Sequence, residues 1–219
     1  MKTDDFIEQL AREVEAVTPL QRPWLRAATW LLGAFLYMGV LTLMMTSSGD
    51  VTTNGAGWWF LLPQVAAIAV SAGAAAAAFA SVVPGASRRV LLWPAAAVVM
   101  WLGSLFVGSV QEWQAIGTLG LAPQREWRCV AMITLGGALP ALGMTLMLRH
   151  GAPLTPRATT ALAVLAAAGL ANVGACVSHP HASSAVVLIW HGTTVMALVA
   201  VSSWAGRSVL SWDRVRHLN

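Results

Sequence analysis

The stretch GWWFLLPQVAAIAVSAGAAAAAFASV, residues 57–82, contains no Asp, Glu, Lys or Arg. About 20 apolar helical residues are enough to cross a hydrocarbon core about 30 Å thick. The run is continuously apolar and does not alternate, which indicates a transmembrane helix and not a barrel strand. Its AAAAAFA tract supplies small side chains, which let helix backbones approach closely in lipid. This stretch therefore predicts a membrane protein built from helices.

Five further apolar runs follow the same pattern, at about 24–46, 90–110, 127–149, 157–177 and 184–206. The chain is 57% hydrophobic and 10% charged, against roughly 25% charged residues in an average soluble domain. The sequence predicts an all-α polytopic membrane protein with six transmembrane helices. Its expected parts are an amphipathic helix at 1–22, a six-helix membrane domain at 23–207 and a C-terminal tail at 208–219.

The basic residues predict how the six spans are oriented. Six spans put both termini on the same side of the bilayer. With a cytoplasmic N-terminus, 11 of the 13 Lys and Arg residues fall inside, and only Arg125 and Arg128 fall outside. Both termini are therefore expected to be cytoplasmic. The basic residues stand in ones and twos beside apolar runs, so their distribution indicates the topology of the spans. The net charge of +4 therefore does not indicate direct binding of nucleic acid.

The N-terminal stretch MKTDDFIEQLAREVEAV predicts a short amphipathic helix outside the membrane. On a helical wheel one arc about 100° wide is apolar, and its members are Phe6, Ile7, Leu10, Val14 and Val17. Five of the nine acidic residues of the chain lie in this segment. A helix resting on anionic lipid would instead be rich in Lys and Arg. The apolar face therefore packs either on the protein's own bundle or in a groove of a cytoplasmic partner.

The two cysteines, Cys129 and Cys176, are expected at the same depth, at the outer ends of spans four and five. A short loop joins these spans, so they are expected to be antiparallel neighbours that can meet the separation of about 7 Å required for a disulfide. His179, His181 and His191 lie in or near the same layer, and with the cysteines they form a candidate site for a soft or borderline metal. Simple packing of each cysteine remains an alternative.

Several function classes lack their signatures. No Asp, Glu, Lys or Arg lies near the middle of a span, whereas ion-coupled transporters usually keep an ionisable group there. Gln64, Asn172 and His191 are the most polar groups in or near the spans, and each is expected to form an interhelical hydrogen bond. A thiol oxidoreductase would be expected to carry a C-x-x-C pair, and the chain has none. A small transporter, or a membrane protein that handles thiols or metals, remains the alternative to a regulatory protein. An enzyme is not expected.

Three parts of the sequence carry a resemblance to a known family. These are the start MKTDDFIEQLAREVEAVTPLQRPWLR, the turn VVPGASRR and the C-terminal CVSHPHASSAVVLIWH. With its six spans, the chain resembles the NrsF-type family, the negative regulators of sigma F, which are bacterial inner-membrane anti-sigma factors. The resemblance implies that the N-terminal helix binds an extracytoplasmic-function (ECF) sigma factor and withholds it from RNA polymerase. It also implies that paired cysteines, here Cys129 and Cys176, sense redox or metal stress.

Overall fold

The computed structural model describes residues 3, 7–8, 11–12, 20–45, 58–85, 87–117, 127–151, 154–178 and 183–210. Within these residues it contains six helical spans that are long and apolar enough to cross a membrane, and no strand. The first, second and fifth spans are single helices, α2 (Pro23–Met45), α3 (Trp58–Ala80) and α7 (Pro156–Ser178). The third is α4 (Leu92–Ile116), which follows a short 3₁₀ turn, η1 (Arg88–Leu91). The predicted all-α, six-span architecture is confirmed.

The fourth and sixth spans are each interrupted by one π-helical turn. The fourth consists of α5 (Trp127–Ala131), η3 (Met132–Gly136) and α6 (Gly137–Arg149). The sixth consists of α8 (Ser184–Val186), η4 (Val187–His191) and α9 (Gly192–Val209). The sequence predicted one transmembrane helix at each place and did not predict these interruptions. Single π turns inside α-helices occur frequently at functional sites.

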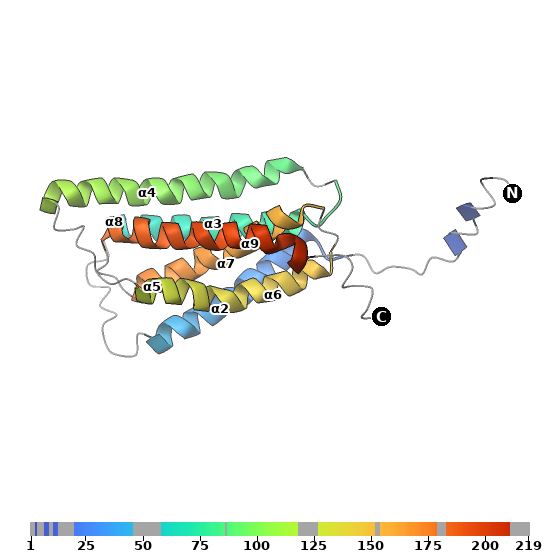
Figure 1. The fold of residues 1–219 in the computed structure, drawn as a ribbon, viewed down its shortest axis with the longest axis horizontal. Helices are drawn as coiled ribbons and strands as arrows, with labels where there is room; N and C mark the ends of the chain where they lie inside the picture. The colour runs from blue at the N-terminus through green and yellow to red at the C-terminus, as the bar shows by residue number, and fades with distance from the viewer. Residues whose placement is uncertain are drawn as a thin grey trace.

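The spans lie roughly parallel in an elongated bundle (Figure 1). We call the end that contains Pro23 and Arg149 the proximal end. The end that contains Met45, Trp127 and Ser178 is the distal end. Because α2 starts at the proximal end, the N-terminal segment joins the bundle there.

The third span is longer than the apolar run predicted. The run ends near residue 110, but α4 continues to Ile116 and stops at Gly117, whose φ of 72° favours glycine. Glu112 lies in this extension. Its carboxylate accepts hydrogen bonds from the backbone N–H of Ser184 at 2.8 Å and from the Ser184 hydroxyl at 2.7 Å. A carboxylate thereby binds the N-terminal turn of the sixth span, where the helix dipole favours negative charge.

Helix α7 occupies the centre of the bundle and packs against α2, α3, α6 and α9. Its buried face consists largely of alanine and glycine. At Gly169 an added Cβ would lie 3.2 Å from the Ala67 carbonyl oxygen of α3. Small residues permit this backbone approach, which is how helices associate in lipid without a hydrophobic driving force.

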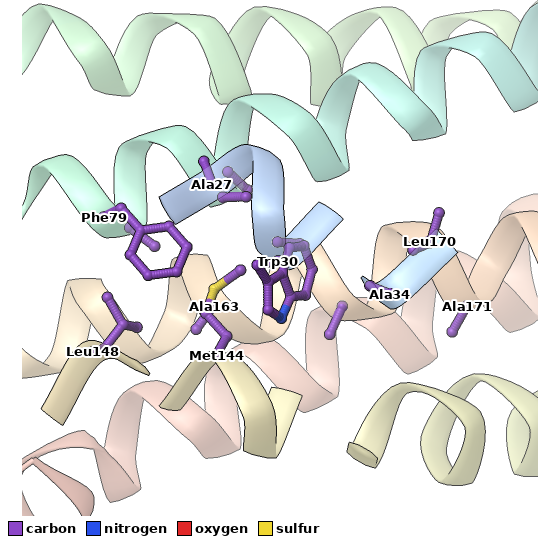
Figure 2. Packing of buried hydrophobic residues seen from close by; sticks show 14 of the residues in the cluster. Ala27, Trp30, Ala34, Phe79, Met144, Leu148, Ala163, Leu170 and Ala171 are labelled. Atoms are coloured by element: carbon purple, nitrogen blue, oxygen red, sulfur yellow. The ribbon is translucent and has the colours of Figure 1, made fainter. Parts of the chain in front are cut away.

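Larger side chains fill the proximal half of the bundle between α2, α3, α6 and α7. Figure 2 shows the Trp30 ring of α2 near Met144 and Ala163, with Phe79 and Leu148 beside them. All five side chains are buried. Helix α2 therefore joins the bundle through an aromatic residue in its second turn.

Candidate functional site

Five residues of the N-terminal segment lie within the described part of the chain, and all five are helical and exposed. Ile7, a member of the predicted partner-binding face, is 58% exposed. On the polar side, Arg12 pairs with Glu8 at 2.7 Å across one helical turn. The other predicted partner-binding residues, Phe6, Leu10, Val14 and Val17, lie outside the described residues. At Ile7 the apolar face is open to a partner.

Two polar contacts hold the start of α2 on the bundle. The Arg26 guanidinium donates to the Met147 carbonyl oxygen of α6 and lies 4.9 Å from the ring centroid of Phe79. One turn later, the Trp30 Nε1–H donates to the Pro140 carbonyl oxygen at 2.9 Å. Pro140 lies inside α6. These contacts fix the helix that follows directly after the N-terminal segment.

Sequence reasoning did not assign this role to Arg26. It counted Arg26 among the flanking cytoplasmic charges, whereas the structure places the residue inside α2 and buries it to 6% exposure. The local sequence WLRAATWLL holds one signal, a single cation at the start of an apolar run. Such a cation either reaches back to the interface or finds a partner inside the bundle. Only the tertiary structure distinguishes the two outcomes.

Both cysteines lie at the distal end, as predicted. Cys129 is the third residue of α5, and Cys176 lies two residues before the end of α7. Both side chains are buried thiols, at 1% and 4% exposure. Helices α5 and α7 are in contact, which agrees with the expected antiparallel neighbours.

The Cys176 thiol belongs to a buried polar cluster that joins three spans. The His191 Nδ1–H donates to Oδ1 of Asn172 at 2.6 Å, and the same nitrogen lies 3.7 Å from the Cys176 sulfur. The Gln64 side chain of α3 also lies beside the Cys176 thiol. Because His191 belongs to η4, the cluster connects α3, α7 and the π turn of the sixth span. A chemical change at the sulfur would therefore act on the packing of all three.

This cluster confirms part of the sequence interpretation. Asn172 and His191 form the expected interhelical hydrogen bond, and Gln64 lies beside the Cys176 thiol. Among the described residues, however, the Gln64 Oε1 and Asn172 Nδ2 atoms are buried without a hydrogen-bond partner. Buried unpaired polar atoms are costly. The cluster thus retains one acceptor and one donor for further hydrogen bonds.

The predicted metal-binding set is only partly described. His179 and His181 lie outside the described residues. His191 faces Asn172 and Cys176 inside the bundle, at 2% exposure. Within the described part of the chain, no three His, Cys, Asp or Glu side chains gather as a metal site. A metal at Cys129, Cys176, His179, His181 and His191 therefore stays a prediction.

A model of the family described as NrsF, negative regulator of sigma F, matches residues 10–212. The match covers the membrane domain and includes Leu10, Val14 and Val17, while Phe6 and Ile7 precede it. Neither the comparison with curated proteins nor that with solved structures gives a match.

Proposed function

Because the chain belongs to the NrsF family of negative regulators of sigma F, we propose that it is an inner-membrane anti-sigma factor for an ECF sigma factor. Its N-terminal helix holds the sigma factor, and a signal at Cys129 and Cys176 releases it. The family match over residues 10–212 is the observation that carries this proposal. The protein acts by binding and not by catalysis.

The distribution of arginines supports a cytoplasmic proximal end. Among the described residues at this end are Arg22, Arg89, Arg149, Arg157 and Arg207, whereas Arg128 lies at the distal end. The positive-inside rule puts the arginine-rich end in the cytoplasm. The N-terminal segment is then on the side where a sigma factor and RNA polymerase are found, and the cysteines are near the periplasm.

The N-terminal helix suits binding in a groove of the sigma factor. Its apolar face comprises Phe6, Ile7, Leu10, Val14 and Val17, and Ile7 is exposed. An amphipathic helix of this kind binds through anchors spaced three and four residues apart. The acidic opposite face is repelled by anionic lipid and stays in the aqueous phase.

Release starts at the thiols. An oxidant takes two electrons and two protons from Cys129 and Cys176 when they form a disulfide, or a soft metal ion binds the sulfurs as thiolates. Either change removes the Cys176 thiol from its contacts with Gln64 and His191. The periplasmic location permits disulfide formation. The signal then passes through helix packing, since α7 contacts α2 and α2 follows the inhibitory helix.

Deleting residues 1–17 tests this assignment. The truncated protein retains all six spans, so it should still be found in the membrane fraction. We expect a sigma-dependent reporter to become constitutively active in cells that carry the deletion. Replacing residues 211–219 with a Gly/Ser sequence of equal length is the control and should leave repression intact. Repression by the truncated protein would show that the N-terminal segment is not the inhibitory element.

A further inference from the structure

We propose that a pocket between the distal ends of α2 and the fourth span binds one anionic phospholipid, with its phosphate on Arg128 and an acyl chain along the apolar wall. This site is separate from the buried polar cluster and from the N-terminal helix. The inference goes beyond the proposed function and does not depend on it.

The pocket has a volume of about 590 Å³, within the range of about 300–1,000 Å³ typical of small-molecule sites. One wall is a single face of α2, formed by Tyr37, Leu41 and Met45 at intervals of four residues. The opposite wall belongs to α5 and η3, with Ser178 of α7 at the end; its members are Trp127, Arg128, Ala131, Met132, Leu135 and Gly136.

Small residues line the pocket on the side of the fourth span. Gly136, the last residue of η3, is buried and offers no side chain toward α2. A Cβ at Gly136 would lie 3.2 Å from the Leu41 Cδ2 atom and 3.7 Å from Met38 Cε. Met38 also reaches Gly174 of α7, so α2 packs closely on the bundle at this depth. Nearer the distal end, the Ala131 side chain is too small to fill the space between α2 and the fourth span.

Arg128 supplies the charge that selects an anion. Its side chain is exposed on the first turn of α5. The ion pair found in the described part of the chain joins Glu8 and Arg12, so no described carboxylate neutralises Arg128. Glu112, an acidic residue at the same end, is engaged with Ser184. A guanidinium binds phosphate oxygens in bidentate geometry.

The depth and polarity of the pocket favour a phospholipid over a soluble anion. Arg128 and Leu135 are seven residues apart, which is about 10 Å along a helix. Trp127 precedes the arginine and is a residue type that prefers the membrane interface. Leu135 and Met45 are 72% and 59% exposed, so an acyl chain has apolar surface to cover. A soluble phosphate would contact Arg128 alone.

Native mass spectrometry of the full chain in detergent tests the proposal. Phosphatidylglycerol is titrated as the anionic probe and phosphatidylethanolamine as the zwitterionic probe. We expect the wild type to retain one phosphatidylglycerol several-fold more strongly than phosphatidylethanolamine. Arg128→Gln should abolish this preference, and Ala131→Trp should reduce retention of both lipids by filling the pocket. Arg128→Lys should keep part of the preference.

Two matched variants control for charge and bulk. Arg207→Gln removes an exposed arginine from the proximal end, and Ala197→Trp adds an indole to an exposed position of α9; neither should change retention. Equal retention of the two lipids by the wild type would overturn the proposal. The proposal would also be overturned if Arg128→Gln retained phosphatidylglycerol as strongly as the wild type does. The pocket would then hold any acyl chain or residues 46–57. Arg128 is exposed, so this variant does not depend on repacking.

Discussion

The Nδ1–H of His191 donates to the Asn172 Oδ1 atom at 2.6 Å, and this bond joins the π turn of the sixth span to α7. Asn172 is fully buried. The bond positions the imidazole so that its Nδ1 atom lies 3.7 Å from the Cys176 sulfur. Packing of the sixth span and the surroundings of the cysteine therefore depend on the same residue.

Asn172→Leu should lower the free energy of unfolding by about 1–2 kcal/mol, since it leaves the His191 N–H without this acceptor inside the bundle. Reversible unfolding in mixed micelles measures the loss. Thr193→Val is the control, because Thr193 is exposed and bonds to carbonyl groups of its own helix; it should stay within about 0.5 kcal/mol of the wild type. Equal effects of the two substitutions would contradict a structural role for the Asn172 bond.

Arg26→Ala should lower the free energy of unfolding by about 2–3 kcal/mol, because it removes a charged hydrogen bond to Met147 and the cation–π contact with Phe79. Arg22→Ala, which removes an exposed arginine one turn earlier, should have little effect. Thermal unfolding of the two variants in the same detergent makes the comparison. A small effect at Arg26 would mean that α2 is held by apolar packing alone.

Gly206→Ala should destabilise the contact between α9 and the start of α7 by about 1–3 kcal/mol. A Cβ at Gly206 would lie 2.8 Å from the Pro156 carbonyl oxygen and 2.9 Å from the Arg157 Cα, both backbone atoms. Gly33→Ala has no atom within 4 Å of its new Cβ and should leave stability unchanged or raise it by up to about 1 kcal/mol. We expect Gly206→Ala to have a lower melting temperature than Gly33→Ala; the reverse order would contradict the close contact between α9 and α7.

Cys129→Ser and Cys176→Ser should each keep repression in unstressed cells but lose induction by the thiol oxidant diamide, because a disulfide needs both sulfurs. The sigma-dependent reporter is read with and without diamide, and with and without Cd²⁺. Ser178→Ala, at the end of the helix that contains Cys176, is the control and should respond as the wild type does. A double serine variant that still responds would exclude the cysteine pair as the sensor.

The positions of the spans could be predicted from sequence because each apolar run matches the bilayer thickness. Their contacts could not be predicted in the same way. Arg26 looks like a flanking charge until Met147 and Phe79 are placed beside it. Glu112 lies beyond the apolar run, and its partner Ser184 is 72 residues away in the chain.

The sequence predicted which residues belong to the candidate site but not which of their side chains contact one another. The cysteines were placed at the correct end of the bundle, and interhelical hydrogen bonds were expected for Gln64, Asn172 and His191. That these three side chains meet around Cys176 depends on the π turn η4, which sets the direction of His191. A π turn changes the helical register within a few residues, a scale that average hydropathy does not resolve.

In the proposed mechanism, the apolar face of the N-terminal helix holds a sigma factor. The most direct measurement is retention of the sigma factor that the chain is proposed to inhibit, in a pull-down with the full-length chain in detergent. Leu10→Glu and Val14→Glu each place a charge on the apolar face, and Ala16→Glu places the same charge on the opposite side of the wheel. We predict that the wild type and Ala16→Glu retain the sigma factor and that Leu10→Glu and Val14→Glu release it. Retention by both face variants, or no retention by the wild type, would contradict the account.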